Sequence, residues 1–153
     1  MKKQILLGTL LVGVLDIGEV VVFAGLKFGT SPMRIFQSVA AGLLGKATYD
    51  GGIKTAILGL ALHFFIAFCV VLTYFLLASK VAFLRDHPLI CFPIYGICVY
   101  LFMRYGVLPL TLAAPKAPPK PINLANQLFA HIFCVGLSAA WFGSRAARAW
   151  RTD

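Results

Sequence analysis

Four long apolar stretches alternate with short polar segments along the chain. They cover residues about 4–27, 53–79, 88–113 and 123–147. At a rise of about 1.5 Å per residue, a helix of this length crosses the roughly 30 Å hydrocarbon layer of a bilayer. The pattern therefore predicts an all-α membrane protein, with four transmembrane helices and short loops forming a single domain over residues 1–153.

A fifth segment, about 31–45, has the pattern of a short amphipathic helix. Ser31-Pro32 is typical of a helix start, with a capping side chain followed by proline in the first turn. Phe36, Val39, Ala40, Leu43 and Leu44 then recur at helical spacing before Gly45. The segment is too short to span a bilayer, so we expect a helix lying at the membrane interface, with a re-entrant hairpin as the alternative.

Composition supports the membrane class and gives a first indication of topology. Hydrophobic residues make up 60% of the chain and charged residues 12%, which is too few charges to cover a soluble domain. The net charge of +9 does not indicate nucleic acid as a partner, because lysine and arginine lie mostly in loops and tails. The densest basic cluster, Arg145, Arg148 and Arg151, follows the last span. We therefore expect both termini in the cytoplasm, in a bacterial inner (plasma) membrane.

Two acidic residues, Asp16 and Glu19, lie one helical turn apart inside the first span, where residues 4–26 carry no other charge. Ionisable groups at that depth are costly and usually face a partner or a water-filled cavity. A cleaved signal peptide is an alternative for this segment, since Met1-Lys2-Lys3 precedes an apolar run. The two acids would interrupt the apolar region of such a peptide.

The other three spans each contain an ionisable residue at a similar depth: His63, Arg104 and His131. Counted from the side of the amphipathic helix and the proline-rich loop, they and the two acids lie about 10–16 Å below the surface. This predicts one polar layer shared by all four helices, in which Arg104 neutralises Asp16 or Glu19. Tyr100, Gln127 and Ser138 lie on matching helix faces and are possible supporting residues.

Three classes of function fit such a layer. The favoured one is a site that binds or moves a small molecule or ion, which would make the protein a possible transport component. The runner-up is a structural or accessory subunit, whose salt-bridge network fixes helix register. The third is a redox protein, in which His63 and His131 hold haem, or hold a divalent metal together with a carboxylate.

The remaining expectations concern enzymes and partners. The chain contains no P-loop, G-x-G-x-x-G, H-E-x-x-H or serine-elbow motif that would indicate a particular enzyme. A bundle this small leaves little interior for a transport path. Besides the lipid bilayer, we therefore expect copies of the same chain, or other membrane subunits, as partners.

The last third of the chain carries a loose family pattern. It consists of Leu108-Pro109-Leu110, Pro118-Pro119, Leu128-Phe129-Ala130-His131-Ile132, Trp141 and a basic end. This part resembles the C-terminal half of YagU-like bacterial inner-membrane proteins. The resemblance implies an inner-membrane location and a helical bundle, and it suggests that His131 belongs to a family pattern. It implies no particular chemistry, because that family has no assigned biochemical activity.

Overall fold

The four predicted spans are present as helices. The computed structural model describes residues 1–114 and 117–152, and these fold into helices and connecting turns without a strand. Four helical regions are long and apolar enough to cross a membrane: Lys2–Phe28, Gly52–Lys80, Pro88–Leu110 and Pro121–Arg151. The all-α class with four spans is thus confirmed, and the chain is a multi-pass membrane protein.

Two spans are single α-helices, whereas the other two change helical type partway. The first and second spans are α1 (Lys2–Phe28) and α3 (Gly52–Lys80). The third consists of α5 (Pro88–Leu101), the π-helical segment η2 (Phe102–Val107) and the 3₁₀ turn η3 (Leu108–Leu110). The fourth consists of α6 (Pro121–Phe129), the π-helical segment η4 (Ala130–Gly136) and α7 (Leu137–Thr152). Such π-helical segments are rare and frequently mark functional sites.

The predicted amphipathic helix is α2 (Pro32–Leu44), and it packs against α3. Its Ser31 cap accepts a hydrogen bond from the Arg34 N–H (3.4 Å). Gln37 is 1% exposed and donates to the Gly52 carbonyl (3.0 Å). A Cβ at Gly59 of α3 would overlap the Phe36 carbonyl, so glycine permits the close approach of the two helices. This close packing explains why the second span carries small residues on one side.

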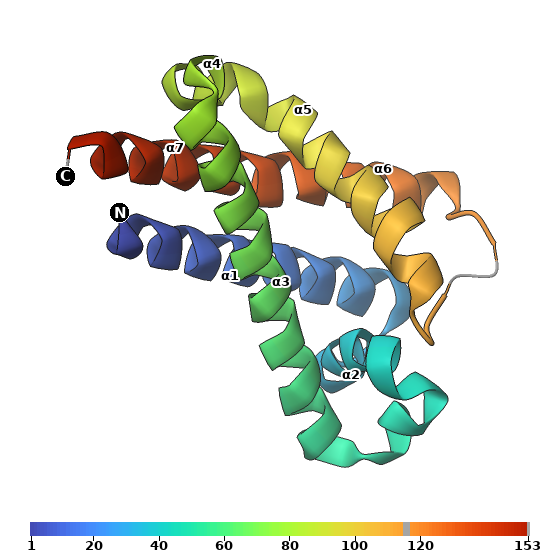
Figure 1. Cartoon of the computed structure of the whole chain (residues 1–153). Coiled ribbons are helices and arrows are strands. Elements are labelled where there is room, and N and C mark those ends of the chain that lie inside the picture. The colour runs from blue at the N-terminus through green and yellow to red at the C-terminus, as the bar shows by residue number, and fades with distance from the viewer. Residues whose placement is uncertain (115–116, 153) are drawn as a thin grey trace.

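The two ends of the molecule differ in their contents (Figure 1). Both termini and the short helix α4 (Ala82–Asp86) lie at one end. Helix α2, the 3₁₀ segment η1 (Gly45–Asp50) and the loop after η3 lie at the other. Helix α3 crosses α1, and α5 diverges from α3 toward the α2 end (Figure 1).

The end that holds the termini, called the packed end here, is filled by side chains. Its buried cluster is Tyr74, Phe75, Ala78, Cys91, Ala140, Ala146 and Ala147. The Tyr74 hydroxyl (2.9 Å) and the Ser144 hydroxyl (3.1 Å) both donate to the Leu84 carbonyl. Arg148 donates to the next carbonyl, that of Arg85 (2.7 Å). These bonds tie α4 to α3 and α7, and they satisfy carbonyls that the short helix leaves free.

Candidate functional site

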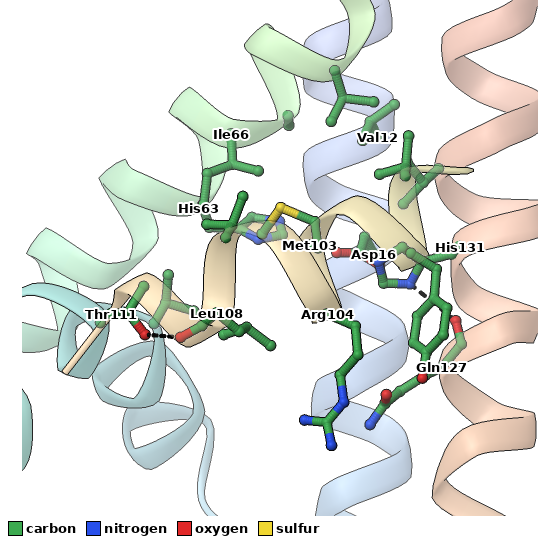
Figure 2. Close-up of a pocket in the computed structure, with 18 of the residues that line it drawn as sticks. Val12, Asp16, His63, Ile66, Met103, Arg104, Leu108, Thr111, Gln127 and His131 are labelled. Carbon is green, nitrogen blue, oxygen red and sulfur yellow. Dashed lines mark hydrogen bonds between the residues drawn. The ribbon is translucent and has the colours of Figure 1, made fainter. Parts of the chain in front are cut away.

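A cavity of about 390 Å³ lies between α3 and α5, in the half of the bundle toward α2 (Figure 2). All four spans and α2 contribute to its lining. Ligand pockets in proteins commonly have volumes of about 300–1,000 Å³, so the space is large enough for a small molecule. The polar side chains in the lining are Asp16, Ser38, His63, Tyr100, Arg104, Thr111, Gln127 and His131.

Six of the eight residues expected from the sequence line this one cavity. They are Asp16, His63, Tyr100, Arg104, Gln127 and His131. Ser138 is buried (4% exposed) but does not belong to the lining, and neither does Glu19. Residues that the sequence placed at a similar depth in the four spans thus lie around one common space.

His63 is positioned by a bond to the first span. It is 9% exposed, and its Nε2 lies 2.9 Å from the Gly13 carbonyl oxygen. Because a carbonyl oxygen can only accept, Nε2 carries the proton of this bond. The Phe64 ring packs edge-on against the imidazole, with the ring centroids 5.7 Å apart. The tautomer and orientation of His63 are therefore set by its surroundings.

His131 is held in a similar way within its own span. Its Nδ1 lies 2.9 Å from the Gln127 carbonyl oxygen, so Nδ1 is the protonated nitrogen. The Tyr100 ring meets the imidazole edge-on, with centroids 5.5 Å apart. His131 belongs to the π-helical segment η4, and a Cβ at Gly96 of α5 would overlap its carbonyl. Close contact between α5 and η4 therefore fixes this part of the lining.

The predicted ion pair between Arg104 and Asp16 or Glu19 is wrong. Within residues 1–114 and 117–152, the salt bridge that forms is Arg85–Asp86 (Nε–Oδ1, 3.1 Å), at the packed end. Arg104 instead donates from Nη2 to the Ala117 carbonyl (2.9 Å). The reason is positional: Arg104 lies in η2, close to the loop, and its long side chain extends toward that loop. In Figure 2 its guanidinium points away from Asp16.

Asp16 and Glu19 face different surroundings although they are one turn apart. Three residues rotate a helix by about 300°, which leaves the two side chains about 60° apart around α1. Asp16 lines the cavity, and its carboxylate accepts no hydrogen bond from the described part of the chain. Glu19 lies beside the Asn126 side chain of α6. The Oε2 of Glu19 and the Oδ1 of Asn123 are buried without a hydrogen-bond partner among the described residues.

The arrangement does not form the metal site that was the third alternative from the sequence. No three His, Cys, Asp or Glu residues in the described ranges are grouped closely enough to hold a metal ion. The site proposed from His63, His131 and one carboxylate is therefore not assembled. Haem ligation by both histidines also gains no support, since Nε2 of His63 is engaged by Gly13.

The sequence reasoning missed the contribution of α2 and of the chain after η3. Ser38, Val39 and Gly42 of α2 line the cavity together with Thr111. The Leu112 N–H donates to the Gly42 carbonyl (3.0 Å), which joins the two segments beside the cavity. Small residues on one side of α3, such as Ala56 and Gly59, are typical of a closely packed helix face and were a usable signal. The sequence did not identify α2 as the packing partner.

Comparisons of the chain with protein-family models, with curated proteins and with solved structures gave no match. They therefore do not bear on the resemblance to YagU-like proteins, which stays a prediction.

Proposed function

We propose that this membrane protein binds a small molecule of mixed polarity in the cavity. The observation that carries the proposal is the meeting of ionisable side chains from all four spans around one space, without ion pairing between them. Ionisable groups inside a membrane protein are costly unless something compensates them. A bound molecule supplies that compensation.

The walls of the cavity favour a ligand with an apolar body. Between the polar groups the lining is made of aliphatic and thioether side chains: Val12, Val39, Ile66, Val70, Val99, Met103, Val107, Leu108 and Val135. Apolar walls with a few well-placed polar groups are the usual composition of small-molecule sites. The same composition is poorly suited to a bare ion, which requires a shell of polar ligands.

The alternative of a purely structural subunit loses its main support. It rested on a network of ion pairs that fixes helix register, with Arg104 at its centre. Arg104 bonds to a loop carbonyl instead, and Asp16 lacks an ionic partner among the described residues. A salt-bridge network that only fixed helix register would be expected to pair Asp16 with Arg104 rather than hold them apart.

A matched pair of variants tests the proposal. Ala67→Phe adds a large side chain to the cavity lining, whereas Ala61→Phe adds the same side chain at an exposed position on α3. Each protein is purified in lipid nanodiscs, and the molecules that remain bound are extracted and quantified by mass spectrometry. We expect at least one compound to be retained by the wild type and Ala61→Phe but depleted from Ala67→Phe. An identical set of compounds from all three proteins would contradict the proposal.

We also propose that both termini are cytoplasmic, in a bacterial inner membrane. The support is the densest basic cluster of the chain, Arg145, Arg148 and Arg151, which follows the last span near the C-terminus. Reporter fusions at the C-terminus check this: a cytoplasm-active reporter should work there, and an export-dependent one should not. Association with further copies of the chain stays a prediction.

A further inference from the structure

We infer that the ligand is a zwitterion: an ammonium group binds at the Asp16 end of the cavity, and a carboxylate or phosphate binds at the Arg104 end. The inference rests on the proposed function and specifies the chemical class of the ligand. It follows from how the charges and hydrogen-bonding groups are distributed along the cavity.

The charges that line the cavity favour a zwitterion. Asp16 and Arg104 both line the cavity, yet no nitrogen of Arg104, His63 or His131 lies within 4.0 Å of an Asp16 carboxylate oxygen. The two opposite charges are therefore present in one space but held apart. A purely cationic ligand would compensate Asp16 and leave Arg104, and an anionic one would do the reverse. A zwitterion compensates both charges at once.

The two ends of the cavity also differ in the hydrogen-bonding groups that they offer. His63 uses Nε2 and His131 uses Nδ1 to donate to carbonyls, so the other ring nitrogen of each histidine is left available as an acceptor whenever the ring carries a single proton. Together with the Asp16 carboxylate they form an acceptor-rich end that suits the N–H groups of an ammonium. In Figure 2 the guanidinium of Arg104 and the side chain of Gln127 lie at the opposite end. Guanidinium and amide N–H groups bind carboxylate or phosphate oxygens.

Two kinds of molecule carry both an ammonium and an anionic group next to an apolar part. One is a free amino acid with an apolar side chain, and the other is the headgroup of an ethanolamine phospholipid. The apolar lining accommodates a side chain in the first case and the start of a lipid tail in the second. Both carry an ammonium and an anionic group separated by a few bonds, so the experiment has one arm for each source.

The experiment uses three probes that differ by one charged group. L-phenylalanine is the zwitterion, 2-phenylethylamine lacks its carboxylate, and 3-phenylpropanoate lacks its ammonium. Binding to the full chain in phosphatidylglycerol nanodiscs is measured by calorimetry. For the lipid arm, phosphatidylethanolamine is added to the nanodiscs, and lipid retained by the protein is measured by native mass spectrometry. Because hydrogen bonds to charged groups are worth about 1.5–3 kcal/mol, we expect the zwitterion to bind at least about tenfold more tightly than either single-charge probe.

Two isosteric variants assign the ends of the cavity. In Asp16→Asn, phenylalanine should no longer bind more tightly than phenylpropanoate. In Arg104→Gln, phenylalanine should no longer bind more tightly than phenylethylamine. In the lipid arm, both variants should retain less phosphatidylethanolamine. The matched controls are Asp50→Asn and Arg34→Gln, which remove the same charges at exposed positions outside the cavity lining. They should bind as the wild type does, and far-ultraviolet circular dichroism of every variant verifies its fold.

The outcomes separate the two proposals. Selective binding of phenylalanine or retention of phosphatidylethanolamine, lost in the cavity variants, supports the inference and identifies the source. Tighter binding of a single-charge probe, or zwitterion binding unchanged by both cavity variants, overturns the inference while small-molecule binding stands. If no probe or lipid binds, and the Ala67→Phe comparison shows no cavity-dependent compound, the proposed function falls as well.

Discussion

The two ends of the bundle treat their polar groups in opposite ways. At the packed end, the hydroxyls of Tyr74 and Ser144 and the guanidinium of Arg148 all donate to backbone carbonyls of the α4 turn. At the cavity end, backbone carbonyls engage one nitrogen of each histidine, but Asp16 has no ionic partner among the described residues. The donors around the α4 turn thus find acceptors within the protein, whereas the Asp16 carboxylate at the cavity end does not find a donor among the described residues.

The difference has a simple geometric origin. At the packed end, alanines of α7 allow the helices to approach closely and fill the interior, as at Ala140 and Ala147, which are both 0% exposed. The Tyr95 hydroxyl donates to the Val70 carbonyl (2.6 Å) and joins α5 to α3. Toward α2 the two helices diverge, and valines line the space instead of filling it. Close packing and hydrogen bonds to the α4 turn therefore stabilise one end, whereas the other end surrounds a cavity.

The largest expected effect comes from adding volume at each end. Ala140→Leu should lower the free energy of unfolding by about 1–3 kcal/mol, because Ala140 is fully buried within the cluster of the packed end. Ala67→Leu should cost less than Ala140→Leu, because Ala67, although only 3% exposed, lines the cavity, into which the longer side chain can extend. Chemical denaturation in detergent micelles measures both. Equal costs would mean that the cavity end is as tightly filled as the packed end.

A medium effect is expected from removing one hydroxyl at each end. Tyr74→Phe deletes the donor to the Leu84 carbonyl and should destabilise the protein by about 0.5–1.5 kcal/mol. Tyr100→Phe should change stability by less than about 0.5 kcal/mol, because the Tyr100 hydroxyl forms no hydrogen bond with the described residues. Thermal unfolding of the two variants side by side gives the comparison. A larger loss for Tyr100→Phe would reveal a structural role at the cavity end.

The smallest effect on stability is expected from neutralising Asp16. In the ligand-free protein, Asp16→Asn should leave the melting temperature unchanged or raise it slightly, because the carboxylate is uncompensated there. Arg85→Gln at the packed end removes the ion pair with Asp86 and should lower stability by about 0.2–1 kcal/mol. Differential scanning fluorimetry of ligand-stripped protein checks both. A marked loss for Asp16→Asn would show that the carboxylate supports the fold.

The spans and the layer of ionisable residues were predictable because they depend on helix geometry. A fixed rise per residue converts sequence position into depth, so the sequence alone places His63, Arg104 and His131 level with Asp16. Alternating helix direction across short loops then brings them to the same side of the membrane. The position of a residue along a helix does not depend on side-chain contacts, so it can be predicted from the sequence alone.

The pairing of charges was not predictable in the same way. Depth does not say which way a long side chain extends, and Arg104 extends to the Ala117 carbonyl. Depth also does not say which of Asp16 and Glu19, about 60° apart around α1, faces the cavity. The π-helical segments η2 and η4 change the direction in which side chains point along two spans, and the sequence did not predict these segments. Tertiary contacts decide these details.

The most direct test of the account is an experimental structure of the wild-type protein in a phosphatidylethanolamine-containing nanodisc, incubated with L-phenylalanine. We expect non-protein density in the cavity that contacts Asp16 at one end and Arg104 at the other. An empty cavity closed by the surrounding valines, with Asp16 and Arg104 in an ion pair, would contradict it.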